Sequence, residues 1–155
     1  MPASIFRPIL VATLIAGTLD ILAATAIALL NGRAPEGMLR TVASGPFPDA
    51  TGWGGAGAAL GLAVHFALMA VMVTVFVLAA ARLRALSEKP LLWGFLYGLG
   101  TYVVMNLVVV PLRWPTAFPP SAVSVATQLF CHIVLVGIPI ALVAAKHFRS
   151  RGAAV

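Results

Sequence analysis

The sequence predicts an all-α membrane protein in which four transmembrane helices form an antiparallel bundle, with a short interfacial helix in the first outer loop. Apolar residues make up 61% of the 155 residues and charged residues only 9%, whereas soluble domains are close to half apolar and about a quarter charged. The mean hydropathy is +1.05. Four apolar blocks also reach the length of about 20 residues that a helix needs to cross a bilayer. We therefore expect one integral membrane domain over residues 1–155, without a separate soluble catalytic domain.

The four apolar blocks begin and end with residues that suit helix termini. Pro8 and Pro90 suit first helical positions, because a proline there loses no intrahelical hydrogen bond. Asn31 followed by Gly32 suits a helix end, and Ser121 suits an N-cap. We expect the spanning helices to cover about residues 8–30, 56–81, 90–111 and 121–145.

The first block differs from a secretory signal peptide. Arg7 precedes the apolar run, as in a signal peptide, but the run is too long and Asp20 lies in its centre. The apolar region of a signal peptide is about 7 to 15 uninterrupted residues long. We therefore expect this block to be retained as the first spanning helix.

The connection between the first two blocks contains an amphipathic segment, Glu36–Ser44. Four apolar residues recur at helical spacing, with Arg40 on the opposite side: Met38, Leu39, Val42 and Ala43. This pattern predicts a short helix that lies on the membrane surface. A lid over the bundle and an ordinary ordered loop are the alternatives.

Small residues recur four positions apart in every predicted span. Such pairs let helix backbones approach closely in lipid, although they do not specify which helices touch. Pro139 predicts a kink or a locally broken hydrogen-bond ladder in the fourth span. The small pairs are Ala24 and Ala28, Gly57 and Gly61, Gly94 and Gly98, and Gly137 and Ala141.

The basic residues are distributed between the blocks rather than in one patch, which indicates a lipid bilayer as partner and no nucleic acid. Their asymmetry predicts a bacterial inner-membrane protein with cytoplasmic N and C termini, because positive loops stay inside. The side of the termini carries seven (Arg7, Arg82, Arg84, Lys89, Lys146, Arg149 and Arg151), and the other side carries three (Arg33, Arg40 and Arg113).

Three ionisable residues fall at one depth within the predicted spans: Asp20, His65 and His132. At about 1.5 Å of rise per residue, each lies roughly 13 to 17 Å below the outer surface. Asn106 lies nearer the outside, with Tyr102 one turn away from it, and Gln128 lies one turn from His132. Ionisable residues inside a membrane usually face the bundle interior. The sequence therefore predicts an outward-facing polar pocket.

Several roles suit this layer of Asp20, His65 and His132. The simplest is structural, in which Asp20 pairs with a histidine and holds the helices together. Alternatively, the pocket binds a small ligand, an ion or a proton in a small transporter or channel, since histidine changes its charge near neutral pH. A b-type haem with His65 and His132 as axial ligands is a further alternative. So is a transition-metal site with all three residues as ligands.

Other function classes are less well supported. The chain lacks a nucleophile beside a base, a phosphate-binding glycine loop and the metal motifs HExxH and CxxC, so we expect no enzyme. Cys131, the only cysteine, lies in an apolar block and suits a core position. The main alternative to a ligand-binding protein is a structural or assembly subunit of a larger membrane complex. A homo-oligomer fits the ligand-binding role, because four helices enclose little volume.

Several segments between about residues 10 and 112 resemble a family of small, uncharacterised four-helix inner-membrane proteins of bacteria. They are Gly17–Asp20, Leu39–Gly45, Gly61–Phe66, Tyr97–Gly98 and Tyr102–Pro111. The resemblance implies the fold and the location, but no catalytic role. It also points to Asp20, Arg40, His65 and Asn106. We expect Arg40 to lie near the mouth of the pocket, where it meets Asp20 or an anionic ligand.

Overall fold

The computed structural model describes residues 5–117 and 119–152, and this part of the chain is almost entirely helical, with no strand. The fold class is therefore confirmed as all-α. Besides α-helices, the described residues form short 3₁₀ helices (η1 and η3) and π-helical segments (η2 and η4). In chain order the elements are α1 (Phe6–Leu30), α2 (Pro35–Ala43), η1 (Pro48–Gly52), α3 (Gly54–Arg82), α4 (Arg84–Glu88), α5 (Pro90–Tyr102), η2 (Val103–Val109), α6 (Val110–Arg113), η3 (Pro115–Ala117), α7 (Ala122–Phe130), η4 (Cys131–Gly137) and α8 (Ile138–Gly152).

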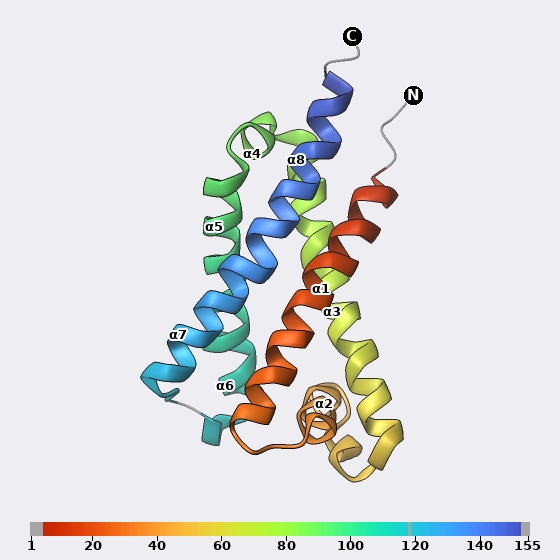
Figure 1. Ribbon diagram of the computed structural model, residues 1–155, viewed down its shortest axis with the longest axis vertical. Helices are drawn as coiled ribbons and strands as arrows, with labels where there is room; N and C mark the ends of the chain where they lie inside the picture. Colours follow the sequence, from red (N-terminus) through yellow and green to blue (C-terminus); the bar gives the residue numbers. More distant parts are fainter. Residues whose placement is uncertain (1–4, 118, 153–155) are drawn as a thin grey trace.

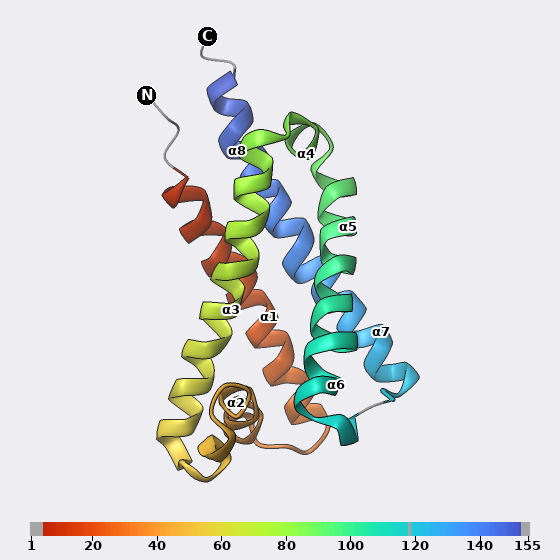
Figure 2. The ribbon, with the colours of Figure 1, turned by 180° about the vertical axis from the view of Figure 1, so that it is seen from behind.

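Four helical stretches of the described chain are long and apolar enough to cross a membrane, as the sequence predicts. The third consists of α5, η2 and α6, which follow one another as one continuous rod (Figure 2). Both chain termini lie at one end of the molecule, whereas α2 lies at the other end (Figure 1). The four stretches are Phe6–Leu30, Gly54–Arg82, Pro90–Arg113 and Ala122–Ser150.

The helix ends follow the local chemistry of the sequence, with one exception. The Ser121 hydroxyl accepts a hydrogen bond from the backbone N–H of Ser124 at 3.1 Å and caps α7. Gly32 has φ +67° directly after Asn31, which ends α1. Pro90 is the first residue of α5. The prediction for Pro8 is wrong, because α1 begins two residues earlier, at Phe6. A proline is still tolerated there, since the first N–H groups of a helix have no intrahelical partner.

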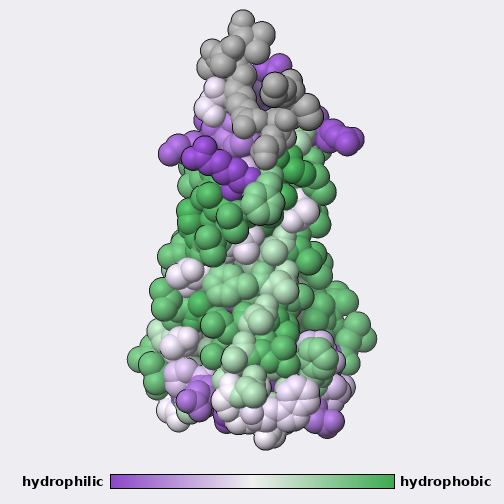
Figure 3. Space-filling view, turned by 90° about the vertical axis from the view of Figure 1, so that its right-hand side faces the viewer, coloured by the Kyte–Doolittle hydropathy of each residue, from purple (hydrophilic) through white to green (hydrophobic). Residues whose placement is uncertain are grey.

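The interior of the molecule is built largely from small residues, and large apolar side chains lie outside. On α1, Ala12 and Ala16 are completely buried, whereas Leu10, Leu14 and Leu22 are exposed. In Figure 3, hydrophobic side chains cover the middle of the visible face, and hydrophilic side chains gather toward its two ends. Small buried residues allow close helix contacts, and lipid can solvate the large exposed ones. This arrangement is the one expected for membrane-spanning helices.

Two of the spanning stretches contain a π-helical segment that ends two residues before a proline. In η2 the N–H of Val110 bonds to the carbonyl of Met105, and in η4 the N–H of Ile138 bonds to that of Ile133. The second residue after each segment is a proline, Pro111 or Pro139, whose ring would clash with the carbonyl four positions earlier. A π turn, which bonds five positions back, is wider and relieves this clash. The disturbance predicted at Pro139 takes this form, and Pro111 follows a second π segment.

The glycine pairs have different partners. Gly94 and Gly98 on α5 lie directly against the backbone of η4, where Gly137 faces them. Gly57 and Gly61 on α3 instead face the outer connection: a Cβ on Gly61 would overlap the backbone carbonyl of Leu39 in α2. Glycine therefore brings two spanning stretches together in one case and seats α2 against α3 in the other.

Arg113, at the end of α6, forms hydrogen bonds with the backbone directly after α2. Its Nε donates to the carbonyl of Gly45 at 3.0 Å, and its Nη2 donates to that of Ser44 at 2.7 Å. The last carbonyls of a helix have no intrahelical partner and carry partial negative charge, so a guanidinium is a favourable ligand for them. The sequence identifies Arg113 only as an outer positive charge. The structure shows that it connects the third spanning stretch to α2.

Candidate functional site

His65 connects α3 to α1 through its ring. Its Nε2 lies 2.9 Å from the carbonyl oxygen of Gly17. A carbonyl oxygen can only accept a hydrogen bond, so Nε2 must carry the hydrogen. In the neutral ring, Nδ1 is then the atom with the free lone pair. The contact with Gly17 thus fixes which nitrogen of His65 remains available for a further proton.

Asp20, one turn after Gly17, lies opposite that available nitrogen. Its Oδ2 is 3.9 Å from Nδ1 of His65, and the side chains are 23% and 12% exposed, respectively. Two lone pairs that face each other repel, so the arrangement favours one proton between the groups. That proton makes either a histidinium and a carboxylate or a neutral histidine and a carboxylic acid. Of the two histidines that the sequence offers as partners of Asp20, His65 is thus the one that faces it, at 3.9 Å.

The sequence around Gly17 explains why α1 can come close enough for this pair. A Cβ on Gly17 would lie 2.6 Å from the Phe66 ring. The same Phe66 ring meets the His65 ring edge-on, with 5.3 Å between the ring centroids. Glycine at position 17 therefore lets Phe66 pack against α1, and Phe66 in turn supports the His65 ring.

His132 lies in η4 and has a different set of contacts. Its Nδ1 is 2.9 Å from the backbone carbonyl of Gln128, one turn earlier, so Nδ1 carries the hydrogen in this ring. The buried Tyr102 of α5 meets the ring edge-on, with 5.9 Å between centroids. The charge of Asp20 acts on both His65 and His132. The two histidines are thus electrostatically connected through Asp20, although only His65 forms an ion pair with it among the described residues.

The outer polar residues line a cavity of about 600 Å³ next to α2. Asn106 and Gln128 both lie in its wall, whereas Asp20, His65 and Tyr102 do not. A smaller hollow of about 260 Å³ shares Gln128 with it. The wall of the larger cavity consists of Arg33, Met38, Thr41, Val42, Asn106, Val110, Trp114, Thr116, Ala117, Pro120, Ser124 and Gln128.

The basic residue of this cavity is Arg33, whereas the sequence pointed to Arg40. Arg40 lies on α2 with its guanidinium 3.8 Å from the Glu36 carboxylate. Its side-chain carbons lie close to Gly57 of α3. In the part of the chain that the structure describes, no hydrogen bond or ion pair joins Arg40 to Asp20. From the sequence, Arg33 counted only as a positive charge that indicates topology. It lies three residues after the end of the first predicted span, so the depth argument could not include it.

The arrangement does not fit the haem or the metal hypothesis. Nε2 of His65 is engaged by the Gly17 carbonyl, so this nitrogen is not free to be a haem ligand. Within residues 5–117 and 119–152, no three His, Cys, Asp or Glu side chains come together in a way that could hold a metal ion. The buried Cys131 is a free thiol in the core.

No protein-family model, no curated protein and no solved structure matches this chain. The family resemblance inferred from its short segments therefore stays a prediction. The functional argument depends on the geometry alone.

Proposed function

We propose that this chain is a small multi-pass protein of the bacterial inner membrane, in which the Asp20–His65 pair binds a proton beneath an outward-facing polar pocket. In this role the protein is a small transporter or channel. The observation that carries the proposal is the hydrogen bond from His65 to the Gly17 carbonyl. It leaves Nδ1 of His65, and no other ring atom, to share a proton with the Asp20 carboxylate.

The cavity beside α2 supports access to the pair from outside. Gln128 lines this cavity and holds the His132 ring through its backbone carbonyl. His132 in turn lies within the electrostatic reach of Asp20. A route for a proton or a small polar ligand would use these polar groups between the cavity wall and the Asp20–His65 pair.

The proposed topology is an antiparallel four-helix bundle with cytoplasmic termini and α2 on the outer membrane surface. The positive-charge asymmetry of seven against three supports this orientation. The location of α2 at the end of the molecule opposite the termini is consistent with it (Figure 1). A C-terminal fluorescent-protein fusion should fluoresce, and a C-terminal alkaline phosphatase fusion should be inactive. The reverse result would place the termini outside and would reverse the direction of the pocket.

The proton site is tested by ¹⁵N NMR of histidine-labelled protein in detergent across a pH range. We expect His65 to keep its hydrogen on Nε2 throughout, while Nδ1 gains a proton as the pH falls. Infrared difference spectra should show the Asp20 carboxyl change in the same pH range. In Asp20→Asn, the amide can donate to Nδ1 but cannot bind or release a proton, so the carboxyl signal should disappear and the ¹⁵N signal of Nδ1 should change. A wild-type pair that binds no proton while the protein remains folded would overturn the proposal.

His65→Gln separates a proton-binding role from a merely structural one. A glutamine amide can still donate to the Gly17 carbonyl, but it has no nitrogen equivalent to Nδ1. Proteoliposomes containing a pH-sensitive dye should therefore lose proton flux with this variant, although its unfolding midpoint should stay near that of the wild type. Unchanged flux would mean that the Asp20–His65 pair only holds α1 and α3 together. Stable purification only with a foreign protein would instead favour a role as a subunit of a membrane complex.

A further inference from the structure

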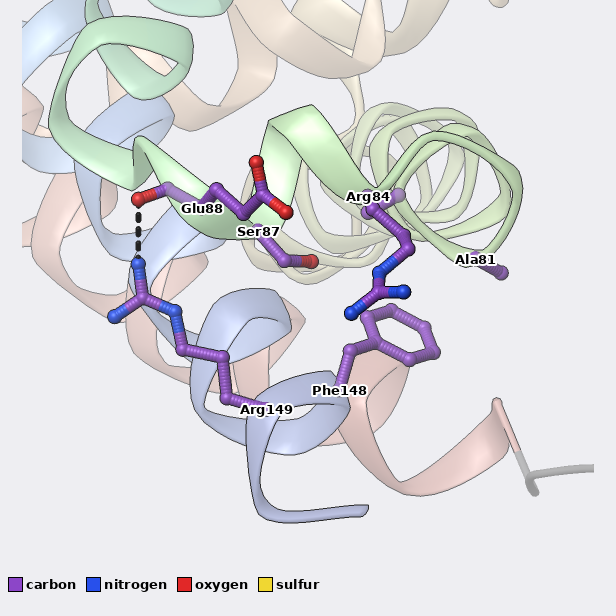
Figure 4. A pocket seen from close by; sticks show the side chains of 7 residues that line it. Ala81, Arg84, Ser87, Glu88, Phe148 and Arg149 are labelled. Atoms are coloured by element: carbon purple, nitrogen blue, oxygen red, sulfur yellow. Dashed lines mark hydrogen bonds between the residues drawn. The ribbon is translucent and has the colours of Figure 1, made fainter. Parts of the chain in front are cut away.

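A second cavity lies at the end of the molecule that carries the termini, away from the proposed proton site (Figure 4). Its volume is about 520 Å³. It lies where α3 ends and the short helix α4 crosses to α5, and α8 forms the other side. The lining residues are Ala80, Ala81, Arg84, Ser87, Glu88, Phe148 and Arg149.

The buried hydroxyl of Ser87 is an unsatisfied hydrogen-bonding group in the described part of the chain. The residue is only 6% exposed, and its Oγ has no hydrogen-bond partner among the residues that the structure describes. Buried hydroxyls are normally paired, and an unpaired one needs an explanation such as a missing ligand. In Figure 4, the Ser87 hydroxyl and the Arg84 guanidinium point into the same space beside Phe148. The cavity thus contains a hydrogen-bond donor that a ligand could satisfy.

The charged residues of the cavity have unused donors. Arg149 donates through Nη2 to the Glu88 backbone carbonyl at 2.7 Å, which leaves its other N–H groups free. Arg84 forms no hydrogen bond and no ion pair with any described residue. The Glu88 carboxylate also lines the cavity, and it pairs with neither arginine. Two positive charges against one negative charge favour an anion, which Glu88 repels in part.

We propose that this cavity binds a phosphate group, with Arg84, Arg149 and Ser87 as its donors. A phosphate presents several acceptor oxygens, and guanidinium groups are well suited to bind them. The cavity lies where α3 ends and before α5 starts, which under the proposed topology is the level of the lipid headgroups. Ala80, Ala81 and Phe148 add an apolar wall. We therefore assign the phosphate to an anionic phospholipid, with free phosphate as the other source.

The test uses the full chain, delipidated in detergent and titrated with phosphatidylglycerol, phosphatidylcholine or inorganic phosphate. The shift in the thermal unfolding midpoint gives an apparent Kd, because a ligand stabilises the state that binds it. We expect phosphatidylglycerol to stabilise the protein much more than phosphatidylcholine does. If inorganic phosphate stabilises the protein as well as phosphatidylglycerol does and competes with it, the lipid assignment is wrong and the ligand is a free anion.

Four variants locate the binding within the cavity. Arg84→Gln and Arg149→Gln should each weaken phosphatidylglycerol binding by about tenfold, as expected for the loss of a charged hydrogen bond. Ser87→Ala leaves the net charge unchanged and should weaken binding by about three- to tenfold. Its unfolding midpoint without lipid should not fall, because the hydroxyl has no bond to lose. Glu88→Gln should tighten binding, because it removes a repelling carboxylate.

Arg82→Gln is the matched control. Arg82 lies two residues before Arg84 at the same end of the molecule, but outside the cavity lining. Its loss should leave the affinity for phosphatidylglycerol within about twofold of the wild type, a difference well under the 1.4 kcal/mol of a tenfold change. If Arg82→Gln weakens binding as much as Arg84→Gln, or if Ser87→Ala binds as the wild type does, the attraction is a diffuse surface effect and the proposed site is wrong.

Discussion

Two contacts between spanning stretches hold the predicted ionisable residues, and they are built in different ways. Between α1 and α3, side chains make the contact: the His65 ring reaches the Gly17 carbonyl, and Phe66 fills the space left by the missing Cβ of Gly17. Between α5 and η4, backbone lies on backbone. A Cβ on Gly137 would lie 2.6 Å from the backbone nitrogen of Gly98 and would overlap the Gly94 carbonyl.

Because of this difference, one contact can position the helices while the other can carry side-chain chemistry. Backbone cannot rotate away, so the contact between α5 and η4 fixes how these two stretches pack. Side chains can change rotamer or protonation state with little movement of the helices that carry them. Under the proposed function, the contact between α1 and α3 is the one that binds and releases a proton at Asp20 and His65. The contact between α5 and η4 serves as the rigid part that positions His132.

The largest effect should come from adding one methyl group to the backbone contact. Gly137→Ala places a Cβ against the Gly94 carbonyl and Gly98, and neither can move without shifting α5. We expect a loss of about 3 kcal/mol in the free energy of unfolding, at the upper end of overpacking effects. The measurement is the unfolding of the full chain in mixed micelles of mild detergent and SDS.

Gly100→Ala is the control for this variant. Gly100 lies in the same helix, α5, but a Cβ there would have no atom within 4 Å. Alanine is a better helix former than glycine, so stability should rise by up to about 1 kcal/mol. If Gly137→Ala and Gly100→Ala unfold alike, the close contact between α5 and η4 does not exist in solution.

A smaller loss is expected from Gly17→Ala in the side-chain contact. The added Cβ would meet the Phe66 ring, which can swing aside, so we expect a loss of about 1 to 2 kcal/mol. The double variant with Phe66→Leu should recover much of this loss, because the smaller side chain makes room for the methyl group. The ¹⁵N signals of His65 should also move in the single variant, since Phe66 supports the His65 ring. Additive losses in the double variant would show that Gly17 and Phe66 do not share this contact.

The fold could be predicted to a large extent because lipid solvation and helix ends leave local signals. Apolar blocks identify the four long helices, and Ser121 and Pro90 lie at helix starts as their chemistry predicts. The segment at 36–44 does form a helix, α2. Its location on the membrane surface stays a proposal.

What could not be predicted depends on how each helix is rotated about its axis. A helix surrounded by lipid is apolar on every side, so its hydropathy pattern does not show which face is inside. For this reason the spacing of Gly57 and Gly61 did not reveal that they face α2, nor did that of Gly94 and Gly98 reveal η4. The same applies to the Ser87 cavity, whose members come from separate helices. In contrast, depth alone places Asp20 at one level with His65 and His132, although it did not show which histidine faces Asp20.

The smallest effect distinguishes the two histidines. His65→Ala removes a hydrogen bond between α3 and α1, and such bonds within a membrane are worth about 1 kcal/mol on average. His132→Ala removes a bond to Gln128 within the same helical stretch and a ring contact with Tyr102, so it should cost about half as much. Unfolding in the same mixed micelles measures both losses, and His65→Gln should restore the stability lost in His65→Ala. A greater loss at His132 would mean that its contact with Tyr102, and not the bond from His65 to Gly17, is the stronger of the two links between helices.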